Sequence, residues 1–247
     1  MTFNISLAGF VFRIDSLYDE IYNMCSSYIV SSEDVDFTIK VCKEDIEKER
    51  EKARLQEERE GRCHEDFSAS YLETLAVYRR IAETMPEHDV FLIHGSALAV
   101  GDSCYLFTAP SGVGKTTHTE LWLENIKGSF IVNGDKPLIR RFGDNFILYG
   151  TPWAGKEGWN RNTSVPLKGI VFLNRGLENR IWRVSASDML PFLISQTYRP
   201  SDIKAQKKTL ELLQSLWSHV PFYKLECNMD KEAALIAYEG ISCQSGT

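Results

Sequence analysis

The stretch Ala109-Pro110-Ser111-Gly112-Val113-Gly114-Lys115-Thr116-Thr117 decides how the rest of the chain is interpreted. It follows the pattern G-x-x-x-x-G-K-[ST], except that alanine replaces the first glycine. In this pattern, backbone N–H groups and a helix N-terminus point at phosphate oxygens, and the glycines allow the close approach. An apolar strand is expected before the stretch and a helix after it. The sequence therefore predicts a phosphate-binding loop between a strand and a helix.

Each side chain of the loop has an expected role. Lys115 would reach the β- and γ-phosphates, and the Thr116 hydroxyl would bind Mg²⁺. Asp135 ends the Asn133-Gly134-Asp135 turn after an apolar strand, where a second contact to the metal ion is expected. ATP and Mg²⁺ are the expected cofactors. The expected nucleotide-binding residues are Pro110, Ser111, Gly112, Val113, Gly114, Lys115, Thr116 and Thr117.

Outward from the loop, apolar or alternating segments predict strands, and segments with helical spacing predict helices. The expected strands are 2–14, 35–41, 90–93, 97–100, 104–108, 130–132, 139–142, 146–149, 167–173 and 181–184. The expected helices are 16–28, 43–60, 67–85, 115–126, 187–196, 202–218 and 230–239. Strands mixed with helices in this way predict an α/β domain with a mixed sheet.

Residues 43–60 form the most biased segment, because 14 of these 18 residues are charged. The absence of Gly and Pro favours a helix, and opposite charges three or four residues apart add support. Such a helix is either a solvated connector or an arm that docks a partner or gates a substrate. A boundary is expected near residues 61–66. It would separate an N-terminal α+β region, residues 1–66, from a catalytic domain of the phosphate-loop type, residues 67–247.

Composition restricts the class of protein. The chain has 247 residues, of which 43% are hydrophobic and 25% charged, as is typical of a globular domain. Its net charge of -6 argues against binding to nucleic acid, which requires a basic surface. No apolar stretch is long enough to cross a membrane, and the N-terminus lacks the basic region of a signal peptide. A cytoplasmic location is therefore expected.

Three matches, taken together, resemble one lineage of phosphate-loop proteins. They are His94-Gly95-Ser96-Ala97, the loop itself, and Val132-Asn133-Gly134-Asp135. The lineage is that of HPr kinase/phosphorylase and phosphoenolpyruvate carboxykinase, and the likeness covers about residues 90–175. It implies the mixed-sheet core of that type, preceded here by a small α+β region.

Further segments resemble the short HPr-kinase-like proteins of bacteria: 150–156, 165–168, 196–200 and 227–230. This resemblance implies an ATP-dependent phosphotransferase that moves the γ-phosphate to a hydroxyl. The acceptor would be a serine of a peptide or protein, or a small metabolite. Relatives are often homo-oligomers, so a homo-oligomer is a further expectation.

One departure concerns the proton acceptor. Gly134 stands where HPr kinases have the first of two aspartates, so the role passes to Asp135 or to His94. The irregular segment 150–162 is rich in Gly, Trp, Asn and basic residues and is expected to be a functional loop. In that loop Trp153, Lys156 and Trp159 are the expected substrate contacts. The catalytic set is expected to be His94, Lys115, Asp135, Arg161 and Arg199, with Arg199 placed by the resemblance and Lys156 as a further cation.

Two other functions remain open from the sequence. Gly134 is compatible with a nucleotide-sensing module that binds without catalysis. Carboxykinase-type chemistry is disfavoured because those enzymes need about twice this length. His118, on the helix after the loop, is expected to be a packing residue.

Overall fold

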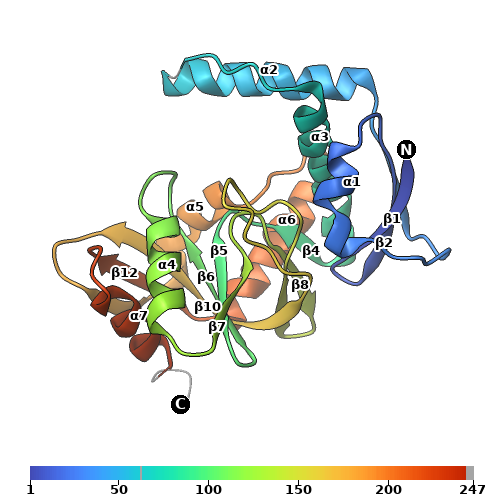
Figure 1. Cartoon of the computed structure of the whole chain (residues 1–247). Coiled ribbons are helices and arrows are strands. Elements are labelled where there is room, and N and C mark those ends of the chain that lie inside the picture. Colours follow the sequence, from blue (N-terminus) through green and yellow to red (C-terminus); the bar gives the residue numbers. More distant parts are fainter. Residues whose placement is uncertain (62, 243–247) are drawn as a thin grey trace. The chain divides into compact units, whose positions relative to one another are not determined.

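Strand β10, Ser164–Arg175, is the strand around which the larger sheet is built (Figure 1). Its first residues pair antiparallel with β9, Asn145–Tyr149. Its later residues pair parallel with β6, Ser103–Thr108, and with β12, Phe222–Cys227. The computed structural model describes residues 1–61 and 63–242. Because β6, β10 and β12 are parallel, their carboxyl ends lie at the same edge of the sheet, and the phosphate loop follows β6 there.

The remaining strands extend this sheet on both sides. The order is β4-β8-β9-β10-β6-β5-β7, and β12 pairs with both β10 and β11. The added strands are β4 (Val90–Leu92), β5 (Ser96–Val100), β7 (Ser129–Asn133), β8 (Leu138–Phe142) and β11 (Arg180–Val184). Parallel and antiparallel pairs occur together, so the fold is α/β with a mixed sheet, as predicted.

Helices cover both faces of the sheet. Leu193 of α5 (Ala186–Gln196) and Leu212 and Leu216 of α6 (Ile203–His219) belong to one core cluster. Trp122 of α4 (Lys115–Asn125) and Ala233 and Ala237 of α7 (Glu232–Ser242) belong to the other. Figure 1 shows α4 and α7 next to each other. A short 3₁₀ helix, η2 (Met85–His88), precedes β4. The two apolar layers hold the sheet, and with it the loop, in place.

The chain divides into two compact units, Met1–Thr84 and Met85–Thr247. The first unit contains a three-stranded sheet of β1 (Thr2–Leu7), β2 (Phe10–Asp15) and β3 (Phe37–Lys40). Its helices are α1 (Glu20–Met24), η1 (Ser26–Tyr28), α2 (Lys43–Glu60) and α3 (Ala69–Thr84). Helix α3 contacts α1, α2 and β3 of this unit. The units therefore divide after α3, whereas the expected boundary near 61–66 lies before it.

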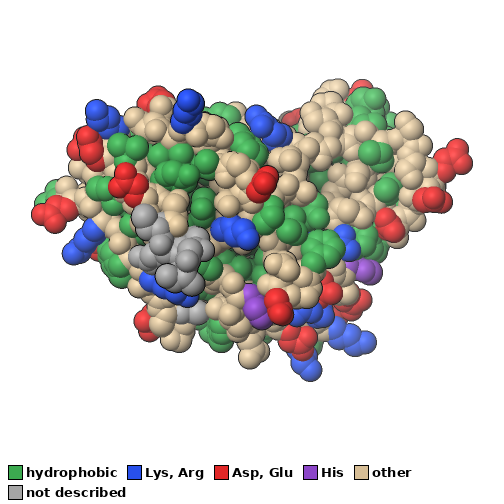
Figure 2. All heavy atoms as spheres, turned by 90° about the horizontal axis from the view of Figure 1, so that it is seen from below, with side chains coloured by type: hydrophobic (Ala, Val, Ile, Leu, Met, Phe, Trp, Pro, Cys, Tyr) green, Lys and Arg blue, Asp and Glu red, His purple; other side chains and the backbone are tan. Residues whose placement is uncertain are grey.

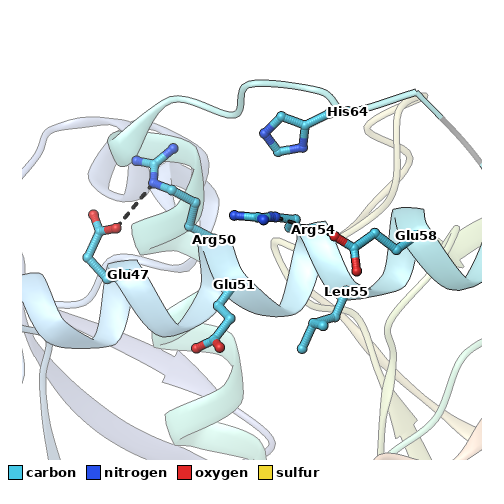
Figure 3. Close-up of a pocket in the computed structure, with 7 residues that line it drawn as sticks. All are labelled: Glu47, Arg50, Glu51, Arg54, Leu55, Glu58 and His64. Carbon is cyan, nitrogen blue, oxygen red and sulfur yellow. Dashed lines mark hydrogen bonds and ion pairs between the residues drawn. The ribbon is translucent and has the colours of Figure 1, made fainter.

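Helix α2 matches the charged segment expected at residues 43–60. Asp45 accepts a hydrogen bond from the backbone N–H of Cys42 at its start, and Gly61 ends it with φ of 63°. A groove of about 550 Å³ runs along this helix, and Figure 3 shows the residues that line it. Arg50 lies 3.4 Å from Glu47, and Arg54 lies 3.4 Å from Glu58. Exposed ion pairs of this kind keep the helix solvated.

The structure differs from two predicted elements and contains one strand that was not predicted. Residues 2–14 form a hairpin rather than one strand, because Ala8 and Gly9 both have positive φ, as a two-residue turn between twisted strands requires. The helix expected at 16–28 is reduced to the short α1 and η1. Strand β12 was not predicted, although Phe222, Tyr223, Leu225 and Cys227 are buried. Its pairing partner β10 lies far away in the sequence, so no local pattern indicated it.

Acidic and basic side chains are interspersed on the face drawn in Figure 2. Within residues 1–61 and 63–242, no helix has both the length and the apolar character needed to cross a bilayer.

A buried carboxylate supports the first unit. Glu73 is fully buried and accepts hydrogen bonds from the backbone N–H groups of Leu17 and Tyr18. Glu73→Ala removes the acceptor of both of these hydrogen bonds, so we expect it to lower the free energy of unfolding of this unit by about 3 kcal/mol. Hydrogen exchange of the amides of β1 and β2 measures the loss. The exposed Glu51→Ala is the control, and equal exchange in the two variants would contradict the prediction.

Candidate active site

The predicted phosphate loop lies between β6 and α4 and has positive φ at two glycines. Gly112 has φ of 78° and Gly114 has φ of 120°, values that side chains other than glycine adopt poorly. Helix α4 begins at Lys115, immediately after Gly114. Ala109, which replaces the first glycine, is fully buried in the core cluster between the sheet and α4. The alanine methyl group therefore packs into the core, and the loop keeps its helix N-terminus.

Arg175, at the end of β10, holds the loop from outside. Its Nε donates to the Val113 carbonyl at 3.0 Å and its Nη2 to the Gly112 carbonyl at 2.6 Å. The C=O and N–H groups of a trans peptide point in opposite directions. The N–H groups that follow these two carbonyls therefore point away from Arg175. The sequence did not indicate this residue, because β6 and β10 meet only in the folded sheet.

Lys115 lies over its own loop. Its Nζ donates to the carbonyls of Ala109 at 2.8 Å and Pro110 at 3.4 Å. Partial burial lowers the pKa of the Lys115 ammonium from its usual value, while the Asp135 carboxylate raises it and Lys136 lowers it further. Lys115 thus interacts electrostatically with Asp135 and Lys136. A bound phosphate would replace the two carbonyls as its partner.

Asp135 is held by the turn that follows β7. The Oδ1 of Asn133, a fully buried residue, accepts from the backbone N–H groups of Asp135 (2.9 Å) and Lys136 (2.7 Å). The Asn133 amide donates to the Thr151 carbonyl at 2.9 Å. The Gly95 N–H donates to the Asp135 carbonyl at 2.9 Å. The acid is therefore fixed by its own turn, by the 150–162 loop and by the segment that carries His94.

His94 is engaged at both ring nitrogens. Nε2 lies 3.2 Å from Oδ1 of Asp135, and Nδ1 lies 2.9 Å from Oε1 of Gln196 at the end of α5. The His94 backbone is also fixed, because its N–H donates to the Gln196 carbonyl and its carbonyl accepts from the Thr108 hydroxyl. Each ring nitrogen thus lies beside one oxygen, Asp135 Oδ1 or Gln196 Oε1, and a neutral ring donates its single N–H to one of the two. The sequence could not indicate Gln196 as a partner, since it lies 102 residues further along the chain.

The residues after His94 have structural reasons to be present. A Cβ at Gly95 would lie 2.8 Å from Leu106 Cδ1 and 2.9 Å from the Phe107 carbonyl oxygen, so only glycine fits. The Ser96 and Thr119 hydroxyls lie 2.7 Å apart in the interior and link β5 to α4. The His94-Gly95-Ser96 motif therefore joins the acid at 135 to the helix that follows the loop.

Charge in the site is balanced around Asp135. Burial raises the pKa of its carboxyl, but the His94 hydrogen bond and the Lys136 charge outweigh burial, and the net result is a lowered pKa. Lys136 Nζ lies 3.4 Å from Asp135 Oδ1. Asp135 is therefore an anion at neutral pH. Its contacts to His94 and Lys136, as far as the described residues show, both involve Oδ1.

The 150–162 loop packs tightly against the turn that carries Asp135. The Gly134 N–H donates to the Trp159 carbonyl at 2.8 Å, and a Cβ at Gly134 would lie 3.0 Å from the Ala154 carbonyl oxygen. Gly155 also approaches Asp135, because a Cβ there would lie 3.4 Å from the Asp135 Cβ. An aspartate at 134 would require this loop to move. The packing of the loop therefore explains why residue 134 is a glycine.

The other expected site residues differ in burial and in the groups that they contact. Trp153 is buried, so its side chain packs inside rather than facing a substrate. Trp159 is half-buried beside Gly134, and Lys156 is exposed. The Arg161 guanidinium lies over the Phe130 ring at 4.7 Å, near the start of β7 and away from the Asp135 end. Arg199 contacts Gln206 of α6 at 3.4 Å. The contacts place His94 and Lys136 at Asp135, whereas those of Arg161 and Arg199 are with Phe130 and Gln206.

The oxygen donors fit a magnesium ion. Thr116, in the first turn of α4, is exposed, and Asp135 is anionic. Mg²⁺ prefers such hard oxygen ligands and is commonly held by one or two protein groups together with substrate phosphates. No cluster of three His, Cys, Asp or Glu side chains suited to a metal ion occurs in the part of the chain that is described. The donor set is thus of the kind that binds Mg²⁺ with a nucleotide.

Comparisons with known proteins give little beyond the fold. No family model matches this chain, and no curated protein matches it. Among solved structures, it is similar to the HPr(Ser) kinase/phosphatase from Coxiella burnetii, with 11% sequence identity and a TM-score of 0.37. That match covers 62% of this chain and 95% of the other. A TM-score of this size carries no functional argument, so the assignments that follow rest on the geometry of the site.

A buried histidine behind the loop makes stability depend on pH. His118 packs against Phe107 with ring centroids 4.8 Å apart, and burial lowers its pKa to about 4. The unfolded chain binds a proton near pH 6.5 and the folded chain does not, so stability falls as the pH drops from about 6.5 to about 4, by up to about 3 kcal/mol. His118→Phe should flatten this dependence in urea titrations. The exposed His88→Phe is the control; an unchanged slope in His118→Phe would contradict the prediction.

Proposed function

We propose that the protein is an ATP-dependent phosphotransferase of the HPr-kinase-like type, which moves the γ-phosphate of ATP to a hydroxyl group. The observation that carries the proposal is a loop with positive φ at Gly112 and Gly114 that begins helix α4 at Lys115, together with an anionic Asp135 held by His94 and Lys136. Phosphoryl transfer depends mainly on positioning and on neutralisation of charge, and these residues supply both.

The loop N–H groups and Lys115 would hold the β- and γ-phosphates. Thr116 and Asp135 would hold Mg²⁺, which neutralises phosphate charge when bound. Lys136, 3.4 Å from Asp135 Oδ1, is the second cation at this point and would offset charge on the transferred group. Arg161 and Arg199, whose contacts lie elsewhere, would have to move to take this role.

The contacts favour Asp135 over His94 as the proton acceptor. Both ring nitrogens of His94 are engaged, one by Asp135 and one by Gln196. Asp135 is kept anionic and uses Oδ1 in its contacts to His94 and Lys136, so Oδ2 is the oxygen proposed to face a substrate hydroxyl. His94 would then orient the carboxylate instead of removing the proton.

The acceptor is proposed to be a hydroxyl on a peptide, a protein or a small metabolite. Trp159, which is half-buried, and Lys156, which is exposed, lie on the loop that covers the Asp135 turn and would contact it. The anionic carboxylate of Asp135, which could accept a proton, favours catalysis over a module that binds nucleotide without turnover. The presence of glycine at 134 does not argue against activity, because a side chain there would collide with the Ala154 carbonyl oxygen.

Removal of the loop lysine tests phosphate binding. Lys115→Ala is expected to weaken MgATP binding at least about tenfold in calorimetry, because the ammonium that reaches the β- and γ-phosphates is lost. Lys127→Ala, which removes a lysine beyond the end of α4, is the control and should bind normally. Equal affinity of Lys115→Ala and the unaltered protein would overturn the phosphate-loop assignment.

Substitutions at Asp135 and His94 test the two proton-acceptor roles. With ADP release from MgATP as the measurement, Asp135→Asn is expected to lose at least about a hundredfold in rate, as for loss of a general base. His94→Asn is expected to lose about tenfold, because the carboxylate remains but is less well oriented. A larger loss in His94→Asn than in Asp135→Asn would show that His94 accepts the proton. His88→Asn is the matched control.

A further inference from the structure

Gln196, the last residue of α5, is joined to His94 both by its backbone and by its side chain. The Gln196 carbonyl accepts a hydrogen bond from the His94 backbone N–H at 2.8 Å, and the Gln196 Oε1 lies 2.9 Å from Nδ1 of the ring. Further along, the backbone N–H of Tyr198 donates to the Leu92 carbonyl at 2.9 Å. The backbone that carries Gln196 is therefore held beside residues 92–94 whatever its side chain is.

The side-chain amide of Gln196 is oriented by a second contact. Its Nε2 donates to the Ser195 hydroxyl at 3.2 Å, and its Oε1 is the atom that faces the His94 ring. Gln196 Oε1 and Asp135 Oδ1 are both acceptors, and they lie at the two nitrogens of the same ring. A ring that carries both protons donates to both oxygens, and a neutral ring donates to one of them. The ring is therefore held between Gln196 and Asp135.

The orientation of the His94 ring affects Asp135 directly. The terminal torsion of a histidine side chain has a broad, roughly two-fold preference, so the ring can turn over unless a partner holds it. A half-turn would place carbon atoms where Nδ1 and Nε2 now lie and would remove the contacts to Gln196 and Asp135. The His94 and Asp135 side chains are 27% and 28% exposed, so water would compete for the carboxylate once the ring is free. A contact at Nδ1 therefore helps to decide whether Nε2 stays at Asp135.

We propose that Gln196 is a positioning residue for the proton acceptor. By holding Nδ1 of His94, it keeps Nε2 at Oδ1 of Asp135, and Oδ2 then remains the oxygen that faces the substrate hydroxyl. The hydrogen bond made by one imidazole nitrogen sets the state of the other in this way. This inference rests on the proposed function. Gln196 acts through His94 and contacts no reacting atom.

Substitutions that remove or keep the acceptor oxygen test this role, with ADP release from MgATP by the full chain as the measurement. Gln196→Met and Gln196→Ala remove the oxygen, and kcat is expected to fall about fivefold while KM for MgATP stays within about twofold, because the phosphate loop is unchanged. The loss should stay below the loss of about tenfold expected for His94→Asn, since Gln196 acts through that ring. Gln196→Glu keeps an oxygen at this place and should restore kcat to within about twofold of the unaltered protein. Gln214→Met, at an exposed position of α6, is the matched control.

A double-mutant cycle separates positioning from a merely structural role. In a His94→Asn chain, the added Gln196→Met change should alter kcat by less than about twofold, because the group that Gln196 holds is already gone. Additive losses in the double variant would contradict the proposal. NMR gives a readout that does not depend on activity. The ring nitrogen resonances of His94, assigned by their absence in His94→Asn, should shift in Gln196→Met and stay unchanged in Gln214→Met.

The outcomes distinguish this inference from the function on which it rests. Absence of both ADP release and MgATP binding in the unaltered protein would overturn the proposed function, and this inference with it. A folded Gln196→Met with normal kcat, or with unchanged ring resonances of His94, would overturn the role of Gln196 and leave the proposed function standing. Failure of both Gln196→Met and Gln196→Ala to fold would show a structural role and would also overturn it. A fall in kcat that Gln196→Glu restores, and that is absent in the His94→Asn chain, supports the inference.

Discussion

The site depends on one backbone constraint, which is that the carbonyls of the phosphate loop must face one way so that its N–H groups face the other. Arg175 imposes this by donating to the carbonyls of Gly112 and Val113. A free loop of this length would sample many conformations, and fixing each residue costs about 1–2 kcal/mol. The guanidinium offsets part of that cost before any ligand binds. Arg175 can act in this way because β10 runs parallel to β6 and ends at the same edge.

A second fixed point holds the acid opposite the loop. Asn133 uses its carbonyl for two backbone N–H groups and its amide for the 150–162 loop, so Asp135 can hardly change position. The hydrogen bond from His94 and the charge of Lys136 then lower the pKa of the Asp135 carboxyl and keep it ionised. Arrangements of this kind, in which donors and charges are oriented before the reaction, provide much of the stabilisation in enzymes. The free energy needed to orient these groups is spent when the chain folds, so they need no further orientation when a ligand binds.

Packing explains the two positions at which the sequence departs from the patterns that it resembles. Ala109 lies in the core behind the loop, where a methyl group contacts neighbours. Gly134 lies under the Ala154 carbonyl, where a side chain would collide. The packing around residues 109 and 134 therefore explains which residue occupies each position. The resemblance noted in the sequence to HPr kinase/phosphorylase concerned the loop, the His94 motif and the Asp135 turn, which are the three segments that the fold brings together.

Local sequence patterns determined the phosphate loop, most helices and strands, and the α/β class, because glycine positions and apolar spacing act over a few residues. They also predicted Lys115 and Asp135 as site residues, whereas His94 was predicted only from the resemblance to HPr kinase/phosphorylase. Only the tertiary structure decided which distant groups meet them: Gln196 at His94, Arg175 at the loop, and β12 beside β10. It also decided that Arg161 contacts the Phe130 ring and that Arg199 contacts Gln206. The physical reason is that strand pairing joins segments far apart in the chain, and a side chain's partner depends on that pairing rather than on its neighbours in sequence.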